Sequence, residues 1–238
     1  MNDNLFGRSQ PILGVEAMEK LKNSTVCIFG LGGVGSFAFE ALVRAGVGRF
    51  SIIDYAKVDA TNINRQLIAL ESTIGSKKTD AASKRAHDIN PGVLVECHDL
   101  FLDESNIEKC IPSETSYIID AVDTVSAKLL LVKYAKKQNI PIISCMGTGN
   151  KVHPEKLGIC DIFKTSVDPL ARVMRTELKK MGIKKLQVVW SDEVPLVKGD
   201  DLPINREGKK VPASISYVPS SAGLMMASVV VNEIAGIS

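Results

Sequence analysis

The hydrophobic and polar positions of this 238-residue chain follow an alternating plan over residues 1–147. Short, almost continuously apolar runs are typical of buried strands, and longer segments with an apolar residue every three or four positions are typical of amphipathic helices. Predicted strands cover 25–29, 50–53, 93–99, 116–123 and 141–147, and predicted helices cover 15–24, 34–45, 77–90, 103–110 and 126–139. Strands that alternate with helices predict an α/β fold with a Rossmann-like, doubly wound, mainly parallel sheet.

Beyond residue 149 this alternation stops. The pattern predicts a strand at 158–163, a helix that begins at Asp168 with Pro169 in its first turn, and a strand at 186–193. A turn-rich stretch at 194–213, which we expect to be mobile, leads to a strand at 214–219 and an apolar helix at 222–234. We expect antiparallel strands of this part to extend the sheet, and the last helix to be buried against the sheet or a partner subunit.

A glycine-rich turn joins the first predicted strand to the helix at 34–45. Its sequence, GLGGVGS, places Gly30, Gly32 and Gly33 where backbone N–H groups and the helix N-terminus favour a phosphate. Asp54 follows the second strand, about 20 residues further on, where a carboxylate can accept hydrogen bonds from ribose hydroxyls. The sequence therefore predicts a nucleotide site, and this motif alone leaves open whether the nucleotide is NAD or another one.

Composition restricts the class of protein. The chain is 45% hydrophobic and 24% charged with a formal net charge of +2, so nucleic-acid binding would require a local basic patch. The first residues have no signal-peptide pattern, and no run approaches the length of a membrane span, so we expect a cytoplasmic protein without membrane association. The five cysteines occur singly, which gives no zinc knuckle, and we expect buried thiols rather than a catalytic one.

Polar residues that suit a polyphosphate follow Asp54. They are Asn62, Asn64, Arg65, Gln66, Lys77 and Lys78. Arginine presents a planar fork to phosphate oxygens and lysine a compact charge, so together they can offset the charge of a leaving pyrophosphate. Hydride transfer from NAD needs no such cluster. Taken singly, Arg65 could cap carbonyl groups in its loop and the two lysines could be a solvated helix start.

Two aspartates stand at the end of the strand predicted at 116–123. Because Mg²⁺ is bound by one or two carboxylates together with phosphate oxygens and water, either Asp120 or Asp123 could hold the metal of an ATP site. The other reading of Asp123 is a helix cap. The sequence therefore predicts a magnesium ligand here without separating the two carboxylates by pattern alone.

Several motifs, in this order and spacing, resemble the E1-like adenylating enzymes, the ThiF-type family that includes activators of ubiquitin and of sulfur-carrier proteins. They are GLGGVGS, IDYAKVDATNINRQ, IGSKKTDA, INPG and IDAVDTVSAK, within about the first 150 residues. The resemblance implies an E1-like ATP-binding adenylation domain over 1–238. Its nucleotide-binding core would be 1–150, its substrate-side and C-terminal extension 151–238, and its crossover loop 194–213.

The same resemblance implies ATP with Mg²⁺ as cofactors. It places Gly30, Gly32, Gly33, Asp54, Asn62, Asn64, Arg65, Gln66, Lys78 and Asp123 at the nucleotide, with Asp54 on the ribose and Asp123 on the metal. It gives catalytic roles to Arg8, Arg65, Lys78 and Asp123. Arg8 stands where relatives carry an arginine that enters the neighbouring subunit's ATP site, which implies a homodimer; an ordinary surface arginine is the other reading.

The segments DIFKTSVDPLARVMRTELKK and SISYVPSSAGLMMASVVVNEI are most similar to family members that cyclise threonylcarbamoyladenosine in tRNA by ATP-dependent dehydration, through an acyl adenylate. This implies tRNA carrying that nucleoside as the partner, and a sulfur-relay protein as a further candidate. Arg172, Arg175 and Lys179, one face of the helix from Asp168, with Lys180, Lys184 and Lys185 close by, could contact tRNA phosphates or form a solvated face.

Three alternatives use parts of the same pattern. The first is an adenylyltransferase that activates the C-terminus of a ubiquitin-like sulfur carrier, and it would need the same ATP residues. The second is a scaffold that binds nucleotide without catalysis, and the third is the dehydrogenase that the glycine turn alone suggests. Zinc-binding relatives carry two C-x-x-C pairs and thioester-forming relatives a crossover-loop cysteine; this sequence has neither, so a thioester step is not expected.

Overall fold

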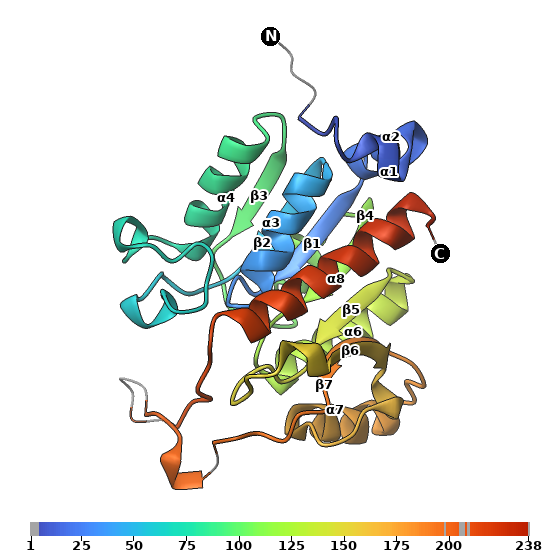
Figure 1. The fold of residues 1–238 in the computed structure, drawn as a ribbon. Coiled ribbons are helices and arrows are strands. Elements are labelled where there is room, and N and C mark those ends of the chain that lie inside the picture. Colours follow the sequence, from blue (N-terminus) through green and yellow to red (C-terminus); the bar gives the residue numbers. More distant parts are fainter. Residues whose placement is uncertain (1–4, 198, 205–207, 209, 238) are drawn as a thin grey trace.

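The computed structural model describes residues 5–197, 199–204, 208 and 210–237. Its centre is a seven-stranded sheet with the order β3-β2-β1-β4-β5-β7-β6 (Figure 1). The strands are β1 Thr25–Phe29, β2 Arg49–Ile53, β3 Leu94–His98, β4 Thr115–Asp120, β5 Ile142–Cys145, β6 Leu157–Asp161 and β7 Gln187–Ser191. All neighbouring pairs are parallel except β6 with β7. This confirms the predicted doubly wound sheet with an antiparallel extension.

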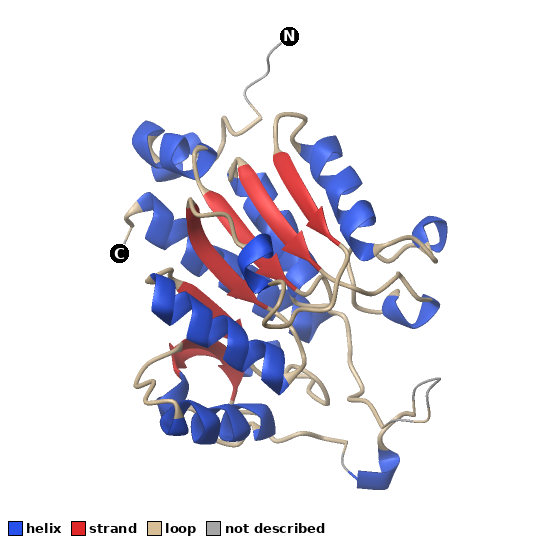
Figure 2. Cartoon of the chain, turned by 180° about the vertical axis from the view of Figure 1, so that it is seen from behind, coloured by secondary structure: helices blue, strands red, loops and turns tan. Residues whose placement is uncertain are grey.

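Helices cover both faces of the sheet. One face carries α2 Val15–Lys22, α3 Gly35–Ala45, α4 Lys78–Ile89 and α8 Tyr217–Ala235, with the short α1 Gln10–Leu13 beside α2. The other face, seen from behind in Figure 2, carries α5 Ile107–Cys110, α6 Val125–Gln138 and α7 Pro169–Lys180. Short 3-10 turns are η1 Ala60–Asn62, η2 Glu71–Thr73, η3 Pro154–Lys156, η4 Ile162–Lys164 and η5 Gly199–Asp201. Each face has its own apolar core.

The helix predicted from Asp168 begins as its sequence dictates. The Asp168 carboxylate accepts a hydrogen bond from the Ala171 N–H, and Pro169 occupies the first turn, where a missing N–H has no consequence. Ala171, Met174 and Leu178 are buried at helical spacing. The helix therefore has one apolar face on the core and its charged residues on the outside.

The strand predicted at 214–219 is wrong, because α8 already begins at Tyr217. The alternation of polar and apolar residues at 214–218 imitates a strand, but Val218 and Ala222 are both buried, one helical turn apart. Pro219 is tolerated because it lies in the first turn. The helix predicted at 103–110 is also too long, since only Ile107–Cys110 is helical, and β4 ends at Asp120 rather than at 123.

The expectation that no apolar run approaches the length of a membrane span is wrong for α8. This helix has 19 residues and a mean hydropathy of 1.3, enough by length and composition to cross a membrane. Its closest neighbour is α3, and it also contacts α2 and the sheet. Val218, Ala222, Met226 and Val230 are buried against this core. The contacts identify it as a packed helix of this fold, as predicted for the apolar C-terminal segment, while Leu224 remains half exposed.

Candidate active site

A cavity of about 690 Å³ opens at the carboxyl ends of the parallel strands. Of the residues predicted for the nucleotide site, Gly30, Gly32, Gly33, Asp54, Arg65, Gln66, Lys78 and Asp123 line it. They come from the loops after β1, β2 and β4 and from the first turn of α4. The cavity thus lies where a doubly wound sheet binds its ligands.

The glycine turn has no side chains between its backbone groups and the cavity at Gly30, Gly32 and Gly33. Gly30 has a φ of +88°, and a Cβ at this position would lie 2.7 Å from the carbonyl oxygen of Ala121. A side chain is therefore excluded on both conformational and steric grounds. The N–H of Gly30 donates to the Ile53 carbonyl at 2.8 Å, which joins the turn to the end of β2.

Asp54 is held in place by the same turn. One carboxylate oxygen accepts the Leu31 N–H at 2.7 Å and the other accepts the Ala56 N–H at 2.8 Å. The side chain is 9% exposed. Because its orientation is set by two backbone donors, this carboxylate presents its remaining lone pairs in a defined direction.

Lys77 and Lys78, predicted together, have different surroundings. Lys78 is the first residue of α4, is 8% exposed, lines the cavity, and has its Nζ 3.8 Å from an Asp54 oxygen. Lys77 is exposed and forms an ion pair of 2.8 Å with Asp99, which raises the pKa of Lys77 by a hydrogen bond and by charge. Only Lys78 lies where it can meet a ligand in the cavity.

Arg65 lies on the cavity wall with its guanidinium donating to the Thr61 carbonyl at 3.0 Å and to the Asn64 side chain at 2.9 Å. Burial lowers the pKa of Arg65, yet an arginine remains protonated at neutral pH. Asn64 also donates to the Ser214 carbonyl at 2.9 Å, so it links this loop to the segment before α8.

Asn62 and Asn64 are not among the described residues that line the cavity. The Asn62 side chain accepts the Asp59 N–H at 3.1 Å in a capping box. The structure therefore has both asparagines building the loop that carries Arg65. Gln66, in contrast, is 7% exposed and lines the cavity, and its Oε1 has no hydrogen-bond partner among the described residues. A buried amide oxygen of this kind is suited to a donor on a ligand.

The two aspartates near the end of β4, Asp120 and Asp123, also have different surroundings. Asp120 is fully buried and bound by Lys128, with both oxygens 3.1 Å from its Nζ, and it also accepts a hydrogen bond from Ser144. Asp123 is exposed at the cavity, and the N-cap position of α6 is Thr124. Only Asp123 is free of a buried ion pair, so its donor chemistry fits a hard cation beside phosphate oxygens.

The remaining wall of the cavity was expected only in outline, as a substrate-side extension at 151–238, and no site residue was predicted in it. It consists of residues 147–151 after β5, the start of α7, and parts of the segment between β7 and α8. Asn150 joins these parts, since its N–H donates to the Ala213 carbonyl at 2.7 Å, its Oδ1 accepts the Ala213 N–H at 2.8 Å, and its carbonyl accepts the Leu196 N–H at 2.8 Å. No short motif indicates this wall. The predicted mobility of 194–213 stays a prediction, and residues 198, 205–207 and 209 lie outside the described part.

Lys151 and Asp168 form a second buried ion pair in this wall, with Lys151 Nζ 3.0 Å from Asp168 Oδ2. Their exposed fractions are 2% and 1%. The sequence pattern indicated Asp168 only as the start of a helix, and it gave no role to Lys151. The GTGNK segment has no pattern that marks its lysine as buried, because the burial arises from packing against α7.

Arg8 does not enter the cavity of its own chain. It is exposed, and the nearby Phe6 packs against Gly46, which follows the C-terminal end of α3. The cavity lies at the opposite, N-terminal end of α3. An Arg8 role in nucleotide chemistry would therefore require a second subunit, as the sequence analysis expects.

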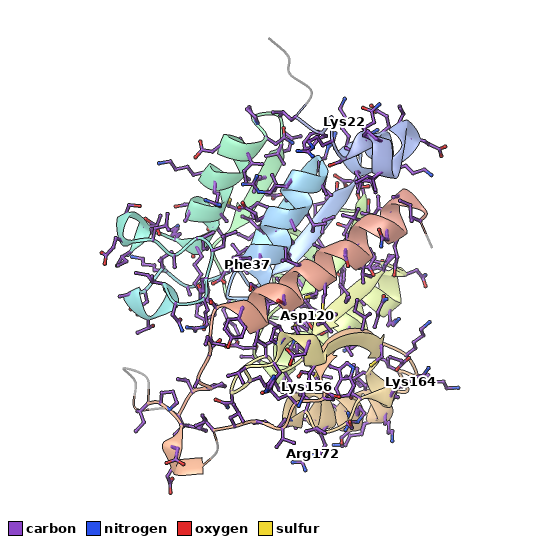
Figure 3. All side chains as sticks on the ribbon, viewed as in Figure 1. Lys22, Phe37, Asp120, Lys156, Lys164 and Arg172 are labelled. Carbon is purple, nitrogen blue, oxygen red and sulfur yellow. The ribbon has the colours of Figure 1, made fainter. Side chains whose placement is uncertain are left out.

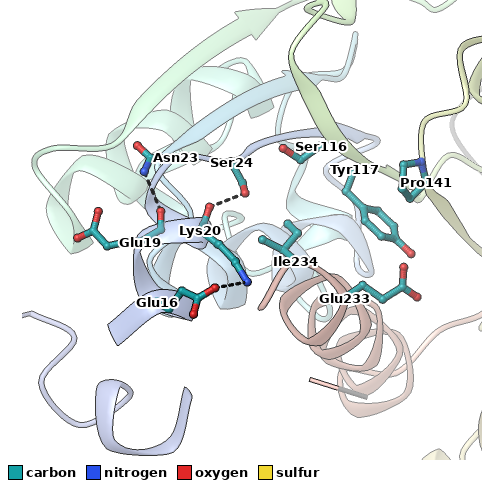
Figure 4. Close-up of a pocket in the computed structure, with 10 residues that line it drawn as sticks. All are labelled: Glu16, Glu19, Lys20, Asn23, Ser24, Ser116, Tyr117, Pro141, Glu233 and Ile234. Carbon is teal, nitrogen blue, oxygen red and sulfur yellow. Dashed lines mark hydrogen bonds and ion pairs between the residues drawn. The ribbon is translucent and has the colours of Figure 1, made fainter. Parts of the chain in front are cut away.

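A second cavity, of about 640 Å³, lies beside α2, the C-terminal end of α8 and the beginning of β4 (Figure 4). Glu16 and Lys20 in it form an ion pair of 2.8 Å, and the Tyr117 hydroxyl donates to Gln187 at 3.4 Å. Burial, together with Glu233, raises the pKa of Tyr117. This cavity contains none of the predicted site residues.

The five cysteines are all free thiols, and the expectation that they are buried is wrong for the exposed Cys97 and the partly exposed Cys160. Cys27 and Cys145 are buried in the sheet, as predicted, and burial raises the pKa of each to about 12. Cys145 lines the cavity wall. At neutral pH its thiol is protonated and therefore a weak nucleophile.

The family model of the ThiF family matches residues 7–231 of the chain. The tRNA threonylcarbamoyladenosine dehydratase of Bacillus subtilis (strain 168) is 46% identical, over 96% of this chain and 94% of that protein. A solved structure of the E. coli tRNA N6-threonylcarbamoyladenosine dehydratase in complex with ATP superposes with a TM-score of 0.88 at 30% identity, covering 97% of this chain and 93% of that one. The adenylyltransferase and sulfurtransferase UBA4 of Vanderwaltozyma polyspora is 35% identical, over 58% of this chain and 31% of that protein. The chain belongs to the ThiF family.

Proposed function

We propose that this protein uses ATP to cyclise threonylcarbamoyladenosine in tRNA by dehydration, through an acyl adenylate. The observation that carries the proposal is the likeness to the Bacillus dehydratase along nearly the whole chain, including the wall opposite the nucleotide residues. The carrier-activating relative matches a smaller share of the chain. Because the carrier activators would use the same ATP residues, it is the acceptor side that separates the two functions.

ATP fits the nucleotide side of the cavity. The backbone of the glycine turn receives phosphates, the Asp54 carboxylate accepts hydrogen bonds from the ribose, and Arg65 and Lys78 supply positive charge from one wall. Gln66 Oε1, buried without a partner among the described residues, accepts a hydrogen bond from the ligand. As pyrophosphate leaves, its growing negative charge is stabilised by the two cations.

Asp123 is the residue that would hold Mg²⁺, which when bound offsets phosphate charge. The described residues contain no cluster of three or more His, Cys, Asp or Glu side chains for a metal, so phosphate oxygens and water would complete its coordination. Asn62 and Asn64 contribute indirectly, by shaping the loop that presents Arg65.

The reaction balances without a nucleophile from the enzyme. The threonine carboxylate attacks the α-phosphorus of ATP and pyrophosphate departs, which leaves an acyl adenylate. A nucleophile of the carbamoyl-adenosine moiety then attacks the activated carbonyl, loses its proton, and expels AMP with the former carboxylate oxygen. Because both reacting groups belong to one substrate, proximity replaces a covalent enzyme step. The protonated Cys145 thiol and the absence of cysteine from 194–213 agree with this route.

The tRNA contacts the outer face of α7. Arg172, Lys179 and Lys180 are exposed on this helix, and the neighbouring α6 adds Lys133, Lys136 and Lys137. Arg175, grouped with Arg172 by sequence spacing, instead donates to the Thr165 hydroxyl and is half-buried. The helix begins at the cavity, where Pro169 and Leu170 line the wall. A tRNA whose phosphate backbone is bound along α7 would therefore have its modified base directed toward the cavity.

The protein acts as a homodimer in which Arg8 of each subunit completes the other subunit's ATP site. The position of Arg8, away from the cavity of its own chain, supports this arrangement. A tRNA substrate agrees with a cytoplasmic location. A sulfur-relay protein remains a candidate partner on the family resemblance alone.

The test is nucleoside analysis by mass spectrometry of tRNA that carries threonylcarbamoyladenosine, after incubation with the protein, ATP and Mg²⁺. The expected result is loss of one water from that nucleoside and formation of AMP. Unchanged tRNA, with adenylation of a ubiquitin-like carrier's C-terminus under the same conditions, would replace the proposal by the carrier-activating function. A thermal shift with NAD but not with Mg-ATP would contradict both.

The metal assignment is tested with Asp123→Asn, and Asp99→Asn is the matched control because both carboxylates are exposed and follow strands. We expect AMP formation to fall on the order of 10²-fold or more in the first variant, since the amide cannot offset the metal's charge, and to change little in the second. Undiminished AMP formation by folded Asp123→Asn would remove this residue from the metal site.

A further inference from the structure

Two buried lysine–aspartate pairs lie at the end of β5, and both lysines also donate to a backbone carbonyl of this region. Lys128 binds Asp120 and the Cys145 carbonyl, the latter at 2.8 Å. Lys151 binds Asp168 and the Gly147 carbonyl. Only the second pair lines the cavity. The proposed chemistry uses neither pair, so the location of the second one calls for an explanation.

The Lys151–Asp168 pair connects two elements that are distant along the chain. Lys151 belongs to the loop after β5, and Asp168 is the N-cap of α7. One Asp168 oxygen accepts the Ala171 N–H at 2.8 Å while the other meets Lys151 at 3.0 Å. A single carboxylate therefore fastens the first turn of α7 to the loop that forms the cavity wall.

Gly147 shows how closely the two elements approach. A Cβ at this residue would lie 2.8 Å from Asp168 Oδ2, which is shorter than real Cβ contacts. Only glycine allows the carboxylate to lie against the loop backbone while it caps the helix. The loop and α7 are thus joined by a close contact, by the ion pair and by the cap.

Stability alone is a weak reason for such a pair. Removing two charges from water is costly, and well-packed apolar residues of similar volume are often as stabilising as a buried ion pair. A buried pair does restrict geometry, because its partners must keep their distance and direction. Lys151 and Asp168 are also neutral as a pair, so they hold the wall without adding net charge opposite Arg65 and Lys78.

We propose that Lys151 and Asp168 are positioning residues that keep α7 in a set position relative to the nucleotide side of the cavity. The inference rests on the proposed function: with tRNA bound along the outer face of α7, the pair determines where the threonylcarbamoyl carboxylate meets the α-phosphate. The residues that bind ATP lie on other elements, so they are independent of this connection.

The test uses the double variant Lys151→Met/Asp168→Asn, in which the amide oxygen can still cap α7. Its control is Lys128→Met/Asp120→Asn, which removes the other buried pair, one that does not line the cavity. Calorimetric Kd values for ATP, the tRNA concentration at half-maximal turnover, and hydrogen exchange of amides 147–151 and of the first turn of α7 are measured in both. Gly147→Ala, which displaces Asp168 without changing charge, is the second variant if the double variant does not fold.

In the Lys151/Asp168 variant we expect an ATP Kd within about twofold of wild type and a half-maximal tRNA concentration raised about tenfold, with faster exchange in both segments. In the Lys128/Asp120 control, the ratio of the ATP Kd to the half-maximal tRNA concentration should be the same as in wild type. Equal loss on the ATP and tRNA sides, or no change in a folded variant, overturns the inference. Failure of the wild type to dehydrate tRNA refutes the proposed function instead. In that case hydrogen exchange still tests the inference, because unchanged exchange in both segments of the Lys151/Asp168 variant would show that the pair does not hold α7 to the loop.

Discussion

The two sides of the active-site cavity are built in different ways. The predicted nucleotide residues come mainly from one stretch of chain, residues 30–78, and residues 100–102 and 121–124, which follow β3 and β4, complete this side. The acceptor side combines residues 147–151, the start of α7 and the segment between β7 and α8, which long-range contacts of Asn150 and Lys151 hold together. The difference indicates that the nucleotide residues are encoded mainly by local sequence, while the wall that we propose as the acceptor side depends on tertiary packing.

The largest effect is expected on the nucleotide side, from Lys78→Met. Loss of the buried cation should lower AMP formation on the order of 10³-fold, because the departing pyrophosphate loses a preorganised charge. Lys77→Met, one residue earlier on the exposed side, should lose only its ion pair with Asp99 and remain close to wild type. Single-turnover AMP assays measure both, and equal losses would contradict the separation of the two lysines.

A smaller effect, on the order of 10²-fold in turnover, is expected for Arg8→Ala, since in the proposed homodimer this charge would complete the site of the other subunit. Arg49→Ala is the control, because Arg49 is exposed at the N-terminal end of β2, the end of the strand away from the cavity. Mixed dimers of Arg8→Ala and Lys78→Ala subunits should regain part of the activity by forming one complete site. No recovery in verified heterodimers would show that Arg8 does not act between subunits.

On the proposed acceptor side, Arg172→Gln/Lys179→Gln should raise the half-maximal tRNA concentration about tenfold and reduce its dependence on salt, because two proposed phosphate contacts would be lost. Lys22→Gln/Lys84→Gln changes the net charge equally on distant helices and should have little effect. Figure 3 shows Lys22 at the opposite end of the molecule from Arg172 and Lys164. Similar effects of both double variants would indicate bulk electrostatics rather than a surface on α7.

The smallest effect is expected for Cys145→Ala, which should change dehydration at neutral pH by no more than about twofold, since a protonated thiol takes no part in the reaction. Burial raises its pKa from 9.0 to about 12, so its contribution to stability is present below pH 9 and is lost as the pH rises toward 12. The unfolding free energy of the alanine variant should therefore fall less steeply above pH 9 in denaturant titrations. A tenfold loss of dehydration with unchanged adenylate formation would reinstate a cysteine step.

The core of the fold was predictable because its signals are local. The apolar run at 25–29 forms β1, and the glycine turn follows it directly. Asp54 follows the next strand, so the two site features lie at the carboxyl ends of neighbouring parallel strands. The strand predicted at 214–219 failed because alternation over a few residues cannot outweigh packing on α3. Lys151 could not be identified because nothing near it in sequence distinguishes a buried lysine from a solvated one.

By itself, the sequence determined the alternating α/β plan and predicted a nucleotide site at the glycine turn, since periodicity and turn chemistry act over a few residues. The order and spacing of its motifs carried the resemblance to adenylating enzymes. The family resemblance assigned Lys78 and Asp123 to the site, and the tertiary structure supplied the physical reason, since Lys77 is paired with Asp99 and Asp120 is paired with the buried Lys128. Only the tertiary structure decided that Asn62 and Asn64 support a loop. Neighbouring residues of the same type have the same local pattern. Their roles diverge through burial and through partners that the fold brings from distant parts of the chain.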